Sequence, residues 1–190
     1  MKKYELTNET IEYKGKKLYR IKALIDFGNV EKGARGGFVE KEENLSMSGN
    51  AWVCDNARVC GDANVCGNAW VCDNAQVSGD ARVSGNAQVS GDARVCGGAN
   101  VCGDANVCGD AQVDKSINYA VIKGFGTCYR STTFFRCQDK TVKVSCGCFL
   151  GTIDEFRNQV KNTRGGKIAK EYLMIADLME IHFSEDGYDG

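Results

Sequence analysis

The chain has 190 residues, with 24 basic and 25 acidic side chains, eleven cysteines and no proline. Its formal net charge of -1 gives no general attraction to nucleic acid or to an anionic membrane. The opening MKKYELTNET has no apolar run behind its lysines, and no stretch approaches the length of a membrane span, so we expect a cytoplasmic protein. In that compartment the cysteines are expected to be reduced thiols.

Residues 1–44 predict a small β cap. Two short alternating runs between residues 4 and 13, followed by an apolar run at Leu18–Ile25, are typical of strands. Val39 stands six residues before Leu45, so the first coil can begin before the repeat becomes regular. Repeat proteins need such a cap, because the open end of a stack exposes an unpaired edge.

Residues 45–116 repeat the motif A-x-V-x-G-[DN] every six residues. Ala and Val lie two positions apart and face inward, while the residue between them and the Cys or Ser after Val face outward. Gly then supplies a left-handed corner, and the Asp or Asn beside it tolerates that geometry. The string GNAWVCDNA recurs after 18 residues, which predicts three hexads per coil and about four coils.

On this register the outward residues form three ladders, namely Trp52, Trp70, Gln88 and Asn106; Arg58, Gln76, Arg94 and Gln112; and Asn64, Arg82 and Asn100. The tryptophan face is either open to a partner or covered by the cap. Cys54 and Cys72 are the one pair of neighbouring thiols in the ladders. Their spacing falls within disulfide range, but parallel in-register side chains rarely reach the required torsion, so we expect free thiols.

The hexad resembles that of left-handed parallel β-helix proteins. More narrowly, LYRIKALIDFGNVEKGARGGFVEKEENLS followed by AWVCDNARV resembles YdcK-like hexapeptide-repeat proteins of phages, prophages and gut bacteria. The resemblance covers roughly residues 17–116. It implies a left-handed coil and a phage-encoded protein that works in the host cytosol.

Residues 117–183 predict a small α+β module, with 184–190 as a disordered acidic tail. Three strands and two helices are expected, at Asn118–Lys123, Thr132–Cys137, Thr141–Cys146, Ile153–Asn162 and Lys167–Phe183. Thr152 and Glu155 form a capping box at the start of the first helix. The helices are expected to cover one face of a three-stranded sheet. The fold class is therefore mainly β: a left-handed parallel β-helix with an N-terminal β cap and a C-terminal α+β module.

Catalytic and metal sites are not expected. Enzymes of this fold typically use histidines as a base or as zinc ligands, and the single histidine, His182, lies outside the repeat. No cofactor is therefore predicted. The cysteines outside the repeat are Cys128, Cys137, Cys146 and Cys148. Zinc binding by these four is one interpretation, but buried thiols of a β-sheet are favoured.

We expect a non-catalytic binding protein that counters a host defence system by binding a host protein or a signalling nucleotide. DNA and membranes are not expected as ligands, because the repeat has four basic and eight acidic side chains. The candidate binding residues are Trp52, Trp70, Arg58, Arg82, Arg94, Phe149 and Arg157. The alternatives are a self-assembling scaffold that forms dimers or trimers, and an acyltransferase-like enzyme.

Overall fold

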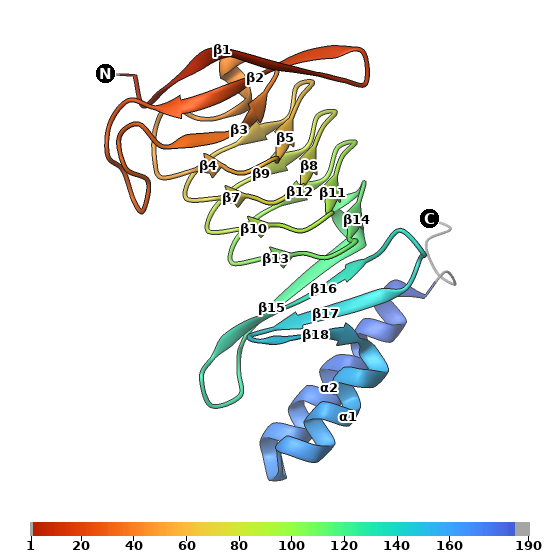
Figure 1. Cartoon of the computed structure of the whole chain (residues 1–190). Coiled ribbons are helices and arrows are strands. Elements are labelled where there is room, and N and C mark those ends of the chain that lie inside the picture. Colours follow the sequence, from red (N-terminus) through yellow and green to blue (C-terminus); the bar gives the residue numbers. More distant parts are fainter. Residues whose placement is uncertain (1, 185–190) are drawn as a thin grey trace.

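A computed structural model describes residues 2–184, and it shows three parts stacked along one axis (Figure 1). N-terminal strands lie at one end, a β-solenoid forms the middle, and a sheet with two helices lies at the other end. The protein is therefore mainly β, as the sequence predicts. None of the helices within residues 2–184 has the length and apolar character needed to cross a membrane.

The solenoid consists of two-residue strands separated by corners. These strands are β4 (Trp52–Val53), β5 (Arg58–Val59), β6 (Asn64–Val65), β7 (Trp70–Val71), β8 (Gln76–Val77), β9 (Arg82–Val83), β10 (Gln88–Val89), β11 (Arg94–Val95), β12 (Asn100–Val101), β13 (Asn106–Val107) and β14 (Gln112–Val113). Each pairs in parallel with the strand 18 residues away, so β4, β7, β10 and β13 form one side and β6, β9 and β12 another. The predicted 18-residue coil and its three ladders are confirmed.

The interior is narrow and fully apolar. In the regular hexads from Ala51 to Val113, Ala and Val are at most 1% exposed. They stack along the axis in one continuous cluster. Backbone N–H groups donate to the coil below; for example, Arg58 N–H donates to the Ala75 carbonyl at 2.9 Å. The core is therefore built from repetition of two small side chains rather than from a few large ones.

The corners adopt the left-handed conformation that the sequence predicts. Gly85, for example, has φ +69°, and a Cβ there would lie 2.9 Å from Gly103 N. Where Asp replaces Gly, at Asp55 and Asp73, φ is 54° and 57°, and the Asp73 carboxylate accepts from Gly91 N–H at 2.8 Å. Asp tolerates this conformation because its short polar side chain can bond nearby backbone.

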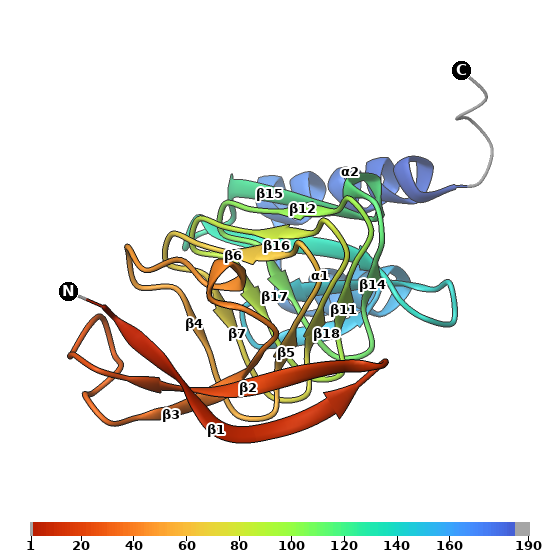
Figure 2. The same cartoon turned by 90° about the horizontal axis from the view of Figure 1, so that it is seen from above.

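The N-terminal strands cover the first coil (Figure 2). β1 (Tyr4–Tyr13) pairs antiparallel with β2 (Lys16–Ala23), and β2 with β3 (Arg35–Val39). The two runs expected between residues 4 and 13 form one strand with an irregularity between Leu6 and Thr10. Val39 pairs in parallel with Val59, so β3 begins the solenoid before the motif is regular, as predicted. A short 3₁₀ helix, η1 (Glu42–Asn44), follows.

A four-stranded sheet covers the last coil. After a 3₁₀ turn, η2 (Ser116–Asn118), it contains β15 (Tyr119–Phe125), β16 (Arg130–Arg136), β17 (Val142–Cys146) and β18 (Phe149–Thr152), in that order. The prediction of three strands missed β18, because its four residues are too few to show a period. Gly147 and Cys148 form a turn between β17 and β18, so Cys146 and Cys148 do not lie on one strand.

Alternate residues of β16 belong to different cores. Phe135 joins the solenoid cluster, whereas Phe134 joins the cluster beneath the helices. α1 (Ile153–Thr163) begins with the predicted capping box of Thr152 and Glu155, and α2 (Gly166–Phe183) follows after a short break. The sheet thus lies between the end of the solenoid and the two helices, and neither end of the solenoid within residues 2–184 is open.

Candidate ligand-binding cleft

A two-lobed cleft opens where the sheet meets the C-terminal end of α1. The first lobe, of about 170 Å³, is lined by the β15–β16 turn, the end of β17, the residue that follows α1 and one residue of α2, including Thr127, Cys128, Arg130, Cys146, Arg164 and Tyr172. The second lobe, of about 250 Å³, shares four of these residues and adds Cys148, Phe149, Phe156, Gln159, Val160 and Thr163. We call this feature the arginine cleft, because Arg130 and Arg164 line both lobes.

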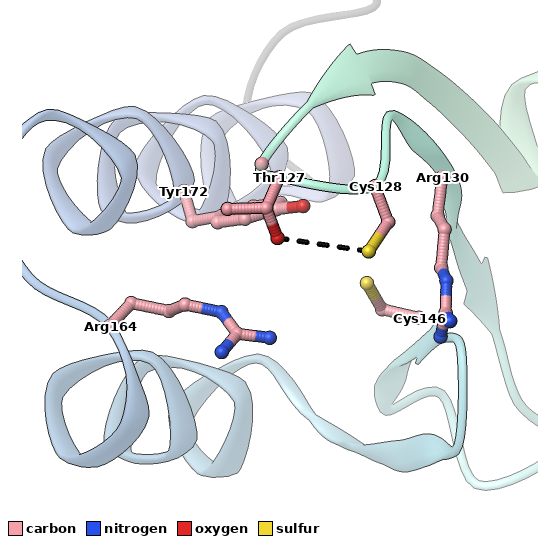
Figure 3. A pocket seen from close by; sticks show the side chains of 7 residues that line it. Thr127, Cys128, Arg130, Cys146, Arg164 and Tyr172 are labelled. Carbon is pink, nitrogen blue, oxygen red and sulfur yellow. Dashed lines mark hydrogen bonds between the residues drawn. The ribbon is translucent and has the colours of Figure 1, made fainter.

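The two guanidinium groups approach the arginine cleft from opposite elements. Arg130 is the first residue of β16, and Arg164 caps the end of α1 (Figure 3). The arginine ion pairs of the described chain use Arg20, Arg35 and Arg157, so no carboxylate of residues 2–184 neutralises Arg130 or Arg164. Neither lobe is lined by an Asp or Glu of that range. The cleft is therefore positively charged.

Glycines in two turns beside the cleft leave space for the side chains of Arg130 and Tyr172, which form its walls. A Cβ at Gly147 would lie 2.7 Å from Arg130 Nη1, so the guanidinium passes over a turn that has no side chain. A Cβ at Gly126, which has φ +71°, would lie 2.4 Å from Tyr172 Oη. Tyr172 donates its hydroxyl hydrogen to the Phe125 carbonyl at 3.2 Å, and burial raises the pKa of Tyr172, so the phenol stays protonated at neutral pH. Tyr172 is thus a fixed wall.

Aromatic side chains form the floor of the second lobe. The ring centroids of Phe149 and Phe156 lie 5.6 Å apart, and those of Phe156 and Tyr172 lie 5.7 Å apart with perpendicular planes. Phe156 is buried, whereas Phe149 is only partly buried. Part of the Phe149 ring therefore remains accessible to a ligand.

The thiols outside the repeat do not form one metal site. Cys137 is buried with the solenoid core, and burial raises its pKa to about 12. Cys128 and Cys146 lie across the first lobe with their sulfur atoms toward one another, and Cys148 borders the second lobe (Figure 3). Since Cys137 lies on the opposite side of the sheet from the other three, the four sulfur atoms cannot bind one zinc ion without rearrangement.

Three of the candidate binding residues predicted from the sequence are not available to a partner. Trp52 is 2% exposed, because the rings of Tyr4 and Phe27 pack edge-on against it. Of the two alternatives for the tryptophan face, coverage by the cap therefore holds at Trp52, which is not accessible as a binding residue. Arg58 lies under the cap with its guanidinium 5.0 Å from the Tyr13 ring centroid. Arg157 is neutralised by carboxylates of both helices, with bonds of 3.0 Å to Asp154, 2.7 Å to Asp177 and 2.6 Å to Glu180.

The other predicted residues are accessible but do not converge. Trp70, Arg82 and Arg94 belong to three different sides of the solenoid. Trp70 is partly buried beside a shallow groove, and the two arginines are exposed. Phe149 alone lies in the arginine cleft. Sequence reasoning missed Arg130, Arg164 and Tyr172. Neither Arg130 nor Arg164 has an acidic residue within four positions, but this signal is weak, because Arg20 shares it and is paired with Glu9.

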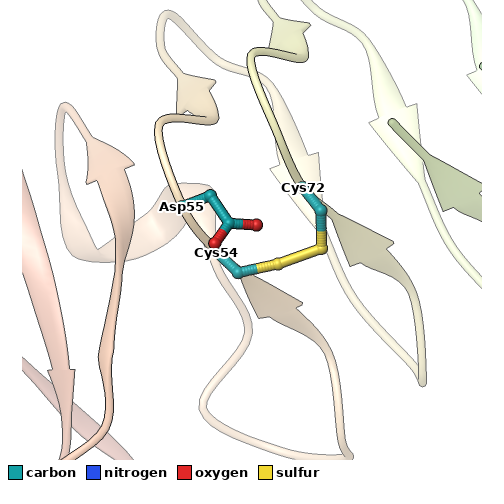
Figure 4. Close-up of side chains that lie close together, drawn as sticks. All are labelled: Cys54, Asp55 and Cys72. Carbon is teal, nitrogen blue, oxygen red and sulfur yellow. A yellow bond between two sulfur atoms is a disulfide. The ribbon is translucent and has the colours of Figure 1, made fainter. Parts of the chain in front are cut away.

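The expectation of free thiols at positions 54 and 72 is wrong. Cys54 and Cys72 form a disulfide between neighbouring coils, with their Cα atoms 4.7 Å apart (Figure 4). In-register stacking places the two residues directly above one another, within the range that a disulfide spans.

The single histidine lies away from the arginine cleft. His182 is partly buried near the end of α2, where its ring packs edge-on against Phe183 at a centroid distance of 4.8 Å. It lines neither lobe.

Comparison with known proteins identifies the repeat. A family model described as the YdcK β-solenoid repeat matches residues 75–89 and 87–103, which contain β8 to β12. The chain carries a YdcK-like β-solenoid repeat. No curated protein matches the chain. This match supports, for the repeat, the resemblance to YdcK-like proteins that the sequence suggests. The residues that line the arginine cleft lie outside the matched residues.

Proposed function

We propose that this YdcK-like repeat protein is a non-catalytic binding protein whose solenoid is a rigid support and whose arginine cleft takes an anionic ligand. The observation that carries the proposal is the pair of guanidinium groups, Arg130 and Arg164, that face one cleft without a carboxylate partner in the described chain. Arginine favours phosphate and carboxylate ligands, because its planar group donates two parallel hydrogen bonds.

The biological setting is part of the same proposal. The resemblance to phage and prophage proteins supports the proposal that the chain works in the cytosol of an infected host. There the anionic ligand is either a signalling nucleotide or an acidic segment of a host defence protein. Sequestration of either by a stoichiometric binder requires no catalytic residue.

The test compares ligand capture by the wild-type protein and by a double variant, Arg130→Gln with Arg164→Gln. Each purified protein is incubated with host lysate and with a panel of cyclic nucleotides, and bound material is identified by mass spectrometry. We expect a ligand that the wild-type protein retains and the folded double variant loses. Equal retention by both proteins would exclude the arginine cleft. Point substitutions are preferable to deletion of residues 117–190, because Phe135 of that part completes the solenoid core.

Self-association through α2 is the second candidate function. Met174, Leu178 and Ile181 are 62%, 55% and 72% exposed, and their spacing places them on one outer stripe of the helix. Such a stripe is unusual for a helix that faces only water. Stacking of solenoids end to end is not favoured, since both ends are covered within residues 2–184.

Light scattering tests this second function. We expect a dimer whose dissociation constant rises at least about tenfold in Leu178→Glu, because the substitution places a charge in an apolar contact. Lys161→Glu, at an exposed position of α1 and therefore outside the α2 stripe, is the control. A wild-type protein that is monomeric at high concentration removes the candidate.

A further inference from the structure

The two lobes of the arginine cleft differ in chemistry, and this difference limits what ligand fits. The first lobe is bordered by hydroxyl and thiol groups, including Thr127 and Cys128. The second has an aromatic floor that includes Phe149. Arg130 and Arg164 belong to both lobes, so a ligand's negative charge is best placed at their junction. The rest of the ligand then extends over the aromatic floor.

The second lobe has the features that recognise a nucleobase. The partly buried ring of Phe149 is supported from below by Phe156, and such platforms stack bases because every base has a π-face. Gln159 also lines this lobe, and its amide has both donors and an acceptor for the edge of a base. A carboxylate side chain or inorganic phosphate would leave this lobe unfilled.

We propose that the arginine cleft binds a nucleotide, with its phosphate between Arg130 and Arg164 and its base against Phe149. This inference rests on the proposed function, because it names the class of the anionic ligand. The guanidinium groups supply the charge and the paired donors that a phosphate requires. Tyr172 contributes shape rather than a donor, since its hydroxyl hydrogen is already donated to the Phe125 carbonyl.

Gly147 leaves the space that the Arg130 side chain occupies beside the cleft. The side chain passes over Gly147, where an added Cβ would meet the guanidinium at 2.7 Å. The β17–β18 turn, with φ +62° at Gly147, thus holds the base of the cleft open.

The test is isothermal titration calorimetry of the full chain with four probes: AMP, adenosine, ribose 5-phosphate and inorganic phosphate. We expect AMP to bind at least about tenfold more tightly than each of the other three, because only AMP fills both lobes. Arg130→Gln and Arg164→Gln should each weaken AMP at least about tenfold. Phe149→Leu should weaken AMP and leave inorganic phosphate unchanged.

Arg94→Gln is the matched control, because it makes the same charge change on an exposed strand of the solenoid, outside the arginine cleft. Thermal unfolding of each variant establishes that it is folded before titration. Equal loss of AMP binding in Arg94→Gln and Arg130→Gln would overturn the inference, since the effect would then be general electrostatics.

Two further outcomes separate this inference from the function on which it rests. If ribose 5-phosphate binds as tightly as AMP, and Phe149→Leu weakens neither, the cleft takes an anion but does not recognise a base. The nucleotide inference then fails and the proposed function stands. If no probe distinguishes the arginine variants from the wild type, and ligand capture from lysate is equally insensitive to them, both fail.

Discussion

At the scale of single residues, the two stacked tryptophans have different roles. Trp52 is enclosed by Tyr4 and Phe27, whereas Trp70 in the next coil is only partly buried. We expect Trp52→Ala to lower the free energy of unfolding by about 3–5 kcal/mol, because it leaves a cavity beneath the cap. Trp70→Ala is the matched control and should cost clearly less. Denaturant unfolding followed by circular dichroism measures both, and equal losses would contradict the burial of Trp52.

The disulfide between Cys54 and Cys72 closes a loop of 18 residues. A cross-link of this span stabilises a protein by about 3 kcal/mol through the unfolded chain. We expect the double variant Cys54→Ser with Cys72→Ser to lose roughly that amount in oxidising buffer. In a reducing buffer, the wild-type protein and the double variant should unfold at the same denaturant concentration. A persistent difference under reducing conditions would mean that the substitutions disturb packing rather than remove a cross-link.

At the scale of elements, the close approach of β3 to the backbone of the first coil requires two consecutive glycines, Gly36 and Gly37. A Cβ at Gly37 would lie 2.6 Å from the Ala57 carbonyl oxygen of the first coil. We expect Gly37→Ala to destabilise the protein by about 1–3 kcal/mol, since β3 must move away from backbone that cannot yield. Gly98→Ala is the control, because its Cβ would meet nothing within 4 Å. Thermal unfolding of the two variants checks the contrast, and a neutral Gly37→Ala would refute it.

The sequence predicts well those elements whose structure depends on residues that lie close together in the chain. The six-residue period places Ala and Val inside and Gly at the corners, and the 18-residue recurrence of GNAWVCDNA fixes the ladders. The capping box predicts the start of α1 for the same reason. β18 was missed because its four residues, with Gly147 nearby, show no period.

The candidate site depends on contacts between distant segments, so little of it could be predicted. Trp52 is covered by residues of the cap more than 20 positions away, which no periodicity reveals. The arginine cleft combines a turn, two strand ends and two helices between residues 126 and 172. Arg157 was chosen although Asp154 and Glu155 precede it, and Asp154 proves to be one of its partners. Local sequence does not identify the unpaired arginines, because Arg20 also lacks an acidic residue within four positions and yet pairs with Glu9.

At the scale of the whole molecule, each coil contacts only its neighbours, and the arginine cleft lies entirely beyond the solenoid. Stability of such a stack is approximately a sum over coils and their interfaces. Side chains at the corners also bond to the neighbouring coil. Hydrogen bonds of 3.2, 3.1 and 3.0 Å link Asn50 to Asn68, Asn68 to Asn86, and Asn86 to Asp104. Removing one complete coil should therefore leave both covered ends intact.

Deletion of residues 76–93 tests this modularity. It removes β8, β9 and β10, joins Ala75 to Arg94, and brings β5 next to β11 in an unchanged register. We expect a folded protein, shorter by about 4.8 Å, with a lower free energy of unfolding and unchanged ligand binding in the arginine cleft. Deletion of only residues 76–78 is the control. It removes half a hexad and places corner residues where the interior needs Val, so it should prevent folding although it removes fewer residues. Loss of ligand binding in a folded 18-residue deletion would show that the solenoid does more than support the cleft.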